Sequence, residues 1–161
     1  MSMQISKIIE NDFDEVLALN EASVPHVNLI GRDELEWFCD NAAFIQVAKI
    51  DSCLAGFLIG LRPGTEYASV NYRWFCDNYD DFAYVDRVIV SEWARRQGVA
   101  EALYLAFARS QAGVAVMTCE VNIRPPNEGS MLYHQRMGFQ QVATQETGGG
   151  EKEVALMEKP L

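Results

Sequence analysis

The chain of 161 residues has no long hydrophobic run, and its N-terminus lacks the apolar core of a signal peptide. A membrane-spanning helix needs roughly 20 mostly apolar residues in a row, and no stretch of this sequence provides them. We therefore expect no membrane span and no secretion, and we predict a cytoplasmic protein.

Basic residues are scarce. The chain has 13 lysines and arginines against 23 acidic residues, which gives a formal net charge of −10. Nucleic acids and anionic membranes are bound mainly through lysine and arginine, so neither is expected as a partner. Arg87, Arg95 and Arg96 form a local exception in this acidic chain. A basic cluster of this size is typical of a site for a small anionic ligand.

Cysteine and histidine are also sparse. The two histidines lie near no cysteine pair, and the four cysteines show no paired spacing: Cys39, Cys53, Cys76 and Cys119. We therefore predict reduced, mostly buried thiols and no zinc-type metal site.

The length and the apolar content, which is 49% of the residues, predict a single folded domain over residues 1–161. Periodicity and turn residues predict strands at 4–9, 43–50, 53–61, 83–90, 114–121, 139–147 and 152–159, and helices at 11–20, 32–41, 98–112 and 128–137. Strands 83–90 and 114–121 should be parallel, with a right-handed crossover, because a helix separates them.

Residues 62–82 are expected to form a long connection. The segment begins with a Pro-Gly pair and mixes several aromatic residues with Glu66, Asp77, Asp80 and Asp81. A connection of this length is usually functional, mobile or packed as a lid. The alternative is that its aromatic side chains fill the open end of the core.

The turn after strand 83–90 carries two arginines and a glycine where the next helix begins. Backbone N–H groups at a helix start have no partner inside the helix, and together they form an anion site. Gly98 allows a ligand to approach the main chain, and Arg95 and Arg96 can hydrogen-bond to phosphate oxygens. The turn therefore favours a phosphorylated ligand.

Two motifs in this order resemble the GNAT superfamily of acyl-CoA-dependent N-acetyltransferases. Residues 95–100 are similar to its acetyl-CoA-binding pattern Gln/Arg-x-x-Gly-x-Gly/Ala. Residues 127–139, from Asn127 through Leu132-Tyr133 to Gly138-Phe139, are similar to its Asn-(x)n-Leu-Tyr-x-x-x-Gly-Phe segment, with four residues in place of three between Tyr133 and Gly138. The likeness spans nearly the whole chain. It implies an α/β (α+β) fold, a three-layer α-β-α sandwich whose mixed, mostly antiparallel sheet is splayed between a parallel fourth and fifth strand.

The resemblance also implies a set of cofactor-binding residues for acetyl-CoA. Backbone amides of the arginine turn would bind the pyrophosphate, main-chain groups of the preceding strand would bind the pantetheine arm, and one residue would contact the cofactor from the other side. The pyrophosphate would be bound by Arg95, Arg96, Gln97, Gly98, Val99 and Ala100. The pantetheine arm would be bound by Val88, Ile89 and Val90, and the contact from the other side would come from Asn127.

Tyr133 is the expected general acid, because a phenol can protonate the departing CoA thiolate. Its alternative role is core packing. Asp86 is the first candidate for the general base and Glu120 the second, while Asp86 could instead be a structural partner of Arg87 or of a backbone amide.

The implied activity is direct transfer of an acetyl group from acetyl-CoA to a primary amine of a small molecule or peptide. A non-catalytic acyl-CoA-binding sensor is the alternative. The aromatic and acidic segment favours a cationic acceptor, and a homodimer is compatible with either function.

Overall fold

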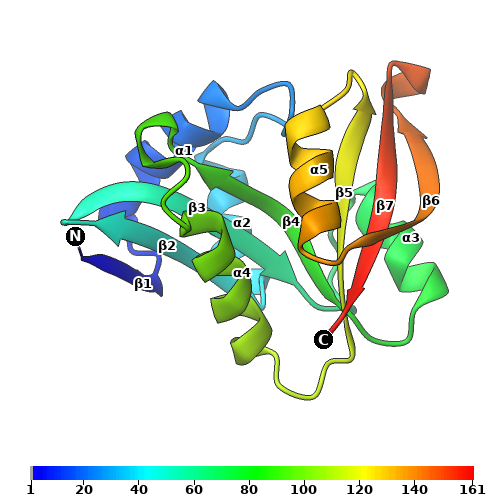
Figure 1. The fold of residues 1–161 in the computed structure, drawn as a ribbon, viewed down its shortest axis with the longest axis horizontal. Coiled ribbons are helices and arrows are strands. Elements are labelled where there is room, and N and C mark those ends of the chain that lie inside the picture. The colour runs from blue at the N-terminus through cyan, green and yellow to red at the C-terminus, as the bar shows by residue number, and fades with distance from the viewer. Residues whose placement is uncertain (1) are drawn as a thin grey trace. The chain divides into compact units, whose positions relative to one another are not determined.

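The computed structural model describes residues 2–161 and arranges them as a mixed α/β fold (Figure 1). In chain order the elements are β1 (Met3–Lys7), η1 (Glu10–Asp12), α1 (Phe13–Ala22), α2 (Arg32–Asn41), β2 (Phe44–Ile50), β3 (Cys53–Leu61), α3 (Val70–Asn78), β4 (Ala83–Val90), η2 (Glu92–Ala94), α4 (Val99–Ser110), β5 (Val116–Arg124), α5 (Glu128–Arg136), β6 (Gln140–Thr147), η3 (Gly148–Gly150) and β7 (Lys152–Pro160).

The strands are hydrogen-bonded in the order β1-β2-β3-β4-β5-β7-β6. β4 and β5 are parallel, with Ala83 opposite Met117 and Tyr84 opposite Thr118, and the β1–β2, β2–β3, β5–β7 and β6–β7 pairs are antiparallel. The predicted mixed sheet with a parallel fourth and fifth strand is confirmed. The consecutive strands β2 and β3 form one hairpin, and β6 and β7 form another.

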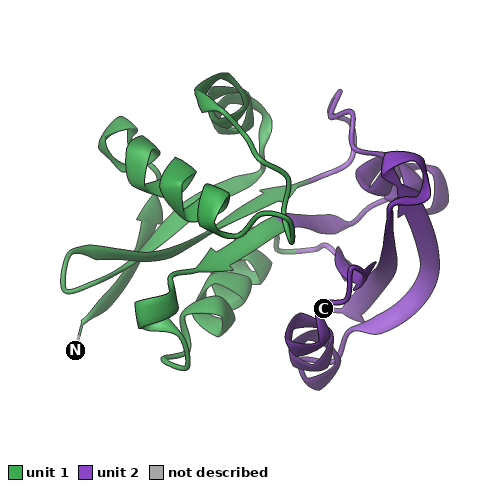
Figure 2. Ribbon diagram, turned by 90° about the horizontal axis from the view of Figure 1, so that it is seen from above, with its two compact units in different colours: residues 1–61, 87–112 green, residues 62–86, 113–161 purple. Residues whose placement is uncertain are grey.

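The chain divides into two compact units (Figure 2). Unit 1 consists of Met1–Leu61 and Arg87–Ala112, and unit 2 consists of Arg62–Asp86 and Gly113–Leu161. The strand β4 contributes residues to both, because its first half belongs to unit 2 and its second half to unit 1.

In unit 1, helices lie on both sides of the strands (Figure 2). The helix α4 packs against β2 and β3. Its buried stripe includes Val99, Leu103 and Phe107, which agrees with the predicted periodicity. The Phe107 ring lies 5.2 Å from the Phe44 ring and occupies the space where a side chain at Gly60 would be. Gly60 therefore brings α4 close to the strands.

Arg87 belongs to the interior of unit 1, which corrects its assignment to an anion-binding cluster. Its side chain is 6% exposed and donates hydrogen bonds to Asn20 Oδ1 at 2.7 Å and to the Asn28 carbonyl at 3.1 Å. Its guanidinium also lies over the Phe38 ring. A side chain held in this way has a structural role, since it satisfies the buried side chain of Asn20 in α1 and holds the connection after α1 through the Asn28 carbonyl.

In unit 2, β7 lies between β5 and β6. The helices α5 and α3 lie on opposite faces of these strands (Figure 1). Side chains of Thr118 and Glu158 share a face because the two residues are directly paired. Tyr79 follows α3 and donates a 2.9 Å hydrogen bond to Glu158, so this face is the α3 face. Burial and the Glu158 carboxylate raise the pKa of Tyr79 to about 12.

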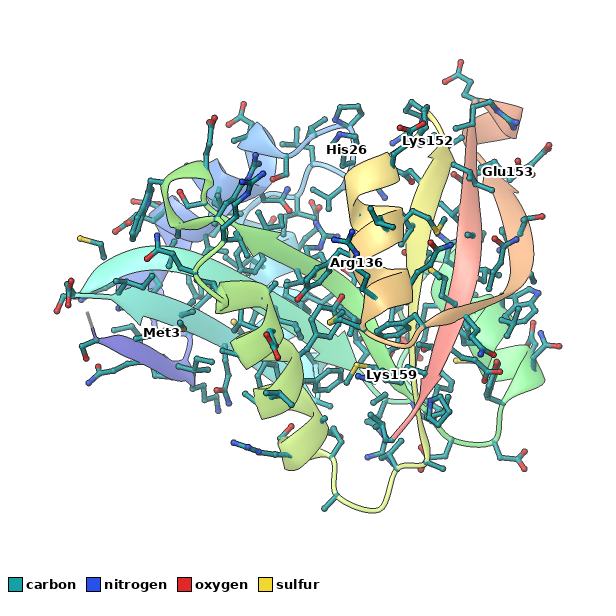
Figure 3. The ribbon with its side chains drawn as sticks, viewed as in Figure 1. Met3, His26, Arg136, Lys152, Glu153 and Lys159 are labelled. Carbon is teal, nitrogen blue, oxygen red and sulfur yellow. The ribbon has the colours of Figure 1, made fainter. Side chains whose placement is uncertain are left out.

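The turn between β6 and β7 is fastened to the end of β5. Arg124 donates a 2.8 Å hydrogen bond to the Gly150 carbonyl and lies within 3.6 Å of the carboxylates of Glu146 and Glu153. Glu153 is at the start of β7 (Figure 3). These pairs are exposed, so their role is to orient the turn, and they add little stability.

The helix α3 corrects the prediction of a loop over residues 62–82. Ser69 caps it, because its hydroxyl accepts a 3.3 Å hydrogen bond from the Tyr72 amide. Tyr72, Phe75 and Phe82 are buried against one another and against Tyr84. The expectation that the aromatic residues fill the core is confirmed for these three. Among residues 2–161, no helix has the length and apolar character needed to cross a bilayer.

Candidate active site

The turn that the sequence singles out belongs to unit 1 and has an unusual backbone. Arg96 has φ +63° and Gly98 has φ +77°, both in the left-handed region. Gly98 is the N-cap of α4, and its carbonyl accepts the first helical hydrogen bond, from Ala102. The amides of Val99, Ala100 and Glu101 therefore have no acceptor within the helix. Three adjacent amides at a helix N-terminus form an anion-binding site.

The side chains around this turn leave it open to a ligand. Arg95, Arg96 and Gly98 are exposed, and Gln97 is half-buried. A Cβ at Gly98 would have no protein atom within 4 Å, so a ligand can lie directly against this main chain. The preceding short helix η2 ends at the buried Ala94, which anchors the turn.

The end of β4 holds the start of the turn. Val88 and Val90 are half-buried, Ile89 is buried, and Ser91 donates a 2.8 Å hydrogen bond to the Ala55 carbonyl of β3. At Gly56 of β3, a Cβ would lie only 2.6 Å from the Ile89 carbonyl oxygen. The glycine thus allows the two strands to approach closely where the turn leaves β4.

The second motif forms the start of α5 in unit 2. Asn127 is the N-cap, and its Oδ1 accepts a 3.3 Å hydrogen bond from the Ser130 amide, as predicted for a capping residue. Tyr133 is half-buried with its hydroxyl oxygen shielded from solvent, and its ring makes an edge contact with His134. This contact orients the Tyr133 ring.

His134 fixes the inner side of α5. It is 6% exposed, and its Nδ1 lies 2.7 Å from the Ser130 carbonyl, so Nδ1 carries the proton and donates it to that oxygen. Burial lowers the pKa of His134, and the hydrogen bond to Ser130 partly opposes this effect. The ring also packs edge-on against Phe139.

A carboxylate and a phenol meet on the α3 face of unit 2. The hydroxyl of Tyr84 lies 2.6 Å and 2.8 Å from the two oxygens of Glu120 and donates its proton to this carboxylate. Tyr84 is fully buried, and burial together with the charges of Glu120, Asp86 and Tyr67 raises its pKa well above the ordinary value. Tyr84 therefore stays protonated and donates its hydrogen bond to Glu120.

Asp86 belongs to the same group. It is two residues after Tyr84 on β4, so the two side chains share a face, and the charge of Asp86 contributes to the raised pKa of Tyr84. Both predicted base candidates, Asp86 and Glu120, thus lie around one buried phenol. Tyr133 comes from α5, on the opposite face of the unit 2 strands (Figure 1).

Tyr84 had no role in the sequence prediction, although it begins the strand that the motif follows. Its strand reads as a buried core strand, and nothing local distinguishes Tyr84 from Val85 or Ile89. The pairing with Glu120 depends on the parallel register that aligns Tyr84 with Thr118, which no short motif encodes. Within residues 2–161, no three His, Cys, Asp or Glu side chains are grouped so that they could hold a metal ion.

Comparison with known families decides what the two motifs mean. The model of the Acetyltransferase (GNAT) family matches residues 13–139, which run through both units and include both motifs. The chain belongs to the GNAT acetyltransferase family. This member of the family is an acetyl-CoA-dependent N-acetyltransferase, so acetyl-CoA is its co-substrate and an amine is the acceptor. No sequence among the curated proteins matches it.

Solved structures of this GNAT fold cover nearly all of the chain. Ard1 from Thermoplasma volcanium is 16% identical with a TM-score of 0.80, and the match covers 100% of this chain and 99% of that one. The ribosomal-protein-S18-alanine N-acetyltransferase from Escherichia coli is 15% identical with a TM-score of 0.73, covering 99% and 94%. Arabidopsis thaliana Naa50, in complex with the bisubstrate analogue CoA-Ac-MVNAL, is 12% identical with a TM-score of 0.75, covering 100% of both chains. At these identities the likeness concerns the fold.

Proposed function

We propose that residues 1–161 act as one N-acetyltransferase domain that transfers the acetyl group directly to a primary amine. The observation that carries the proposal is the Tyr84–Glu120 pair, a carboxyl group that accepts the hydrogen bond of a buried phenol, with Asp86 beside it. Negative groups of this kind suit an acceptor that arrives as an ammonium ion.

For the donor, we propose that the amides of residues 95–100 bind the pyrophosphate of acetyl-CoA. The exposed side chains of Arg95 and Arg96 add charge-assisted hydrogen bonds. Main-chain groups of Val88, Ile89 and Val90 would receive the pantetheine arm, and Asn127 would contact the cofactor. Open space beside Gly98 and the left-handed backbone of the turn support this assignment.

In the reaction, Asp86 accepts a proton from the ammonium, either directly or through a water molecule, and Glu120 is the second candidate for this role. The neutral amine then attacks the thioester carbonyl carbon and forms a C–N bond. The tetrahedral intermediate collapses as the C–S bond breaks, and the departing thiolate takes a proton from the Tyr133 hydroxyl. The nitrogen loses its second proton as the amide forms, and this proton restores the Tyr133 hydroxyl through solvent. The products are an N-acetyl amide and CoA. No covalent enzyme intermediate is required, because the two substrates react while held in contact.

A peptide N-terminus or a lysine side chain is our preferred acceptor, ahead of a small-molecule amine. The similar structures include an enzyme named for ribosomal protein S18 alanine and one with a peptide-containing bisubstrate analogue. We propose a cytoplasmic location, since all four cysteines are free thiols, and we expect no nucleic acid or membrane partner for a chain of net charge −10. A homodimer is compatible with this function.

The variant Tyr133→Phe tests the enzyme against the alternative of an acyl-CoA sensor. We expect kcat to fall about 100- to 1,000-fold while the Kd for acetyl-CoA changes less than about twofold, because the phenol acts only on the leaving group. Tyr79→Phe is the matched control, since it removes another hydroxyl from unit 2 and should leave kcat within about twofold. Unchanged kcat in Tyr133→Phe rejects its role as the acid, and wild-type protein that binds CoA but releases no thiol with any amine supports the sensor.

A further inference from the structure

Within the segment of residues 62–82, one hydroxyl ties the start of the segment to α3. The Tyr72 hydroxyl donates a 2.7 Å hydrogen bond to the Arg62 carbonyl and accepts hydrogen bonds from the amide and hydroxyl of Thr65, at 3.2 Å and 3.0 Å. Tyr72 is 1% exposed. Because one buried group satisfies three polar atoms of the connection, residues 62–65 have a fixed path into α3.

Tyr67 follows this fixed path and lies at the Tyr84–Glu120 pair. Its amide donates a 3.4 Å hydrogen bond to Thr65 Oγ1, and its ring centroid is 5.6 Å from that of Tyr72. The Tyr72 ring lies in turn 5.5 Å from the Tyr84 ring. Tyr67 is also one of the groups that raise the pKa of Tyr84, together with Glu120 and Asp86. The three half-buried side chains Tyr67, Asp86 and Glu120 therefore surround one phenol.

We call Tyr67, Asp86 and Glu120 the acid–aromatic group. Its floor is formed by Tyr72 and Tyr84, which are buried. Two carboxylates and a tyrosine ring around the same buried phenol attract an organic cation, because the ring quadrupole and the carboxylates both favour positive charge. Partial burial strengthens this attraction relative to water.

An independent observation points to a ligand with N–H donors. Thr118 is 0% exposed, and its hydroxyl oxygen has no hydrogen-bond partner within residues 2–161. It is two residues before Glu120 on β5 and directly opposite Tyr84 on β4, so its side chain points to the face that carries the acid–aromatic group. An orphaned buried hydroxyl is costly unless a ligand completes its hydrogen bonds.

We propose that the acid–aromatic group is the subsite for the acceptor's ammonium group, with Tyr67 as a specificity-determining residue and Thr118 as an acceptor for an ammonium N–H. Tyr72 is a positioning residue that holds Tyr67 through residues 62–65. This inference rests on the proposed function, since it names how the same reaction selects its amine. Of the acidic residues in the 62–82 segment, Asp81 pairs with Arg62 at 2.8 Å.

The test uses two probes that cannot be acetylated, in the presence of CoA. Tetramethylammonium carries a positive charge and no N–H, and tert-butanol is a neutral molecule of similar size. NMR titration of wild-type protein should show tetramethylammonium binding at least about 10-fold more tightly than tert-butanol. Equal binding of the two probes overturns the proposal.

Variants separate the roles within the subsite. Tyr67→Leu should weaken tetramethylammonium binding about 10-fold. Tyr67→Phe keeps the ring, so its affinity should stay within about twofold of wild type. Tyr72→Phe keeps the buried ring but frees residues 62–65, so it should lower the preference for the cation over tert-butanol while the Kd for CoA stays constant. Unchanged tetramethylammonium affinity in Tyr67→Leu overturns the proposal, and so does a loss of affinity in Tyr67→Phe as large as that in Tyr67→Leu.

The role of Thr118 has its own pair of probes. Thr118→Val preserves the shape of the side chain and removes its hydroxyl, so methylammonium binding should weaken about fivefold while tetramethylammonium binding is unchanged. An equal change for both ions contradicts the assignment. These binding tests are independent of catalysis. If tetramethylammonium binding depends on Tyr67 but the protein acetylates no amine, the subsite is supported and the proposed function is rejected. If the protein acetylates amines but shows no preference for cations, only the subsite is rejected.

Discussion

The arginine turn of unit 1 and the acid–aromatic group of unit 2, which we propose as the donor and acceptor sites, would hold a charged ligand by opposite means. The turn offers main-chain amides at the start of α4, with exposed arginines and space beside Gly98. The acid–aromatic group offers side chains whose positions are set by the buried Tyr72 and Tyr84. A main-chain site suits a donor common to a whole family, while a side-chain site can differ from member to member. This difference favours the turn for the donor and the acid–aromatic group for the acceptor.

The largest effect that separates the two regions is expected from Glu120→Gln. The amide has the size of the carboxylate but lacks its charge, so kcat/KM for the amine should fall about 100-fold. KM for acetyl-CoA should stay within about twofold, because the turn is unchanged. Steady-state kinetics with each substrate varied in turn measures both values.

Glu158→Gln is the control for this prediction. Glu158 also accepts a hydrogen bond from a tyrosine and lies on the same face of unit 2, but its partner is Tyr79. We expect its kcat/KM for the amine to remain within about threefold of wild type. A similar loss in both variants would mean that Glu120 acts through the fold and not through the ammonium.

A smaller effect, on the donor and not on the amine, is expected from Gly98→Ala. The new Cβ would meet no protein atom within 4 Å but would stand where the donor approaches, so KM for acetyl-CoA should rise about 10-fold and KM for the amine should not change. The left-handed φ of +77° adds about 1–2 kcal/mol of strain to the folded chain.

Gly113→Ala is a control that introduces a similar backbone strain away from the proposed donor site. Gly113 has φ +92° and, like Gly98, open space at its Cβ position, but it follows the other end of α4. Both variants should lose similar thermal stability, and only Gly98→Ala should affect the donor. If Gly113→Ala raises KM for acetyl-CoA as much, the turn has no special role.

The smallest effect concerns His134, which supports the helix of Tyr133. Burial lowers its pKa in the folded protein, so the unfolded chain binds more protons just below the ordinary value of 6.5. The contribution of His134 to the free energy of unfolding is complete above the unfolded pKa and is lost as pH falls toward the folded pKa. Acidification from about pH 7.5 to about pH 5.5 should thus destabilise wild type more than His134→Gln. Urea unfolding at both pH values measures this, and parallel losses would contradict it.

The sequence predicts the main-chain site far better than the side-chain site. Residues 95–100 and Asn127 lie within short motifs whose glycine and capping residues determine the local backbone, and the starts of α4 and α5 lie close to where the motifs predict them. The helix α3 was missed because Asn71, Asn78 and several aromatic residues are weak helix formers. Ser69 and the spacing of Tyr72, Phe75 and Tyr79 were the available signals.

The Tyr84–Glu120 contact could not be predicted in the same way. The two residues are 36 positions apart, and they meet only because β4 and β5 are parallel in one particular register. A shift of one residue would turn one of the side chains to the other face. Arg87 shows the converse error: its charge suggested a ligand, but the fold uses it to hold Asn20 and Asn28.

Acetyl transfer from acetyl-CoA to a cationic amine can be measured in one assay. Thiol release from acetyl-CoA is followed against a library of peptides and small amines, and the products are identified by mass. We expect release that depends on the amine, favours cationic acceptors over neutral or anionic molecules of similar size, and yields N-acetylated products. Tight CoA binding without thiol release for any amine would contradict the proposed reaction.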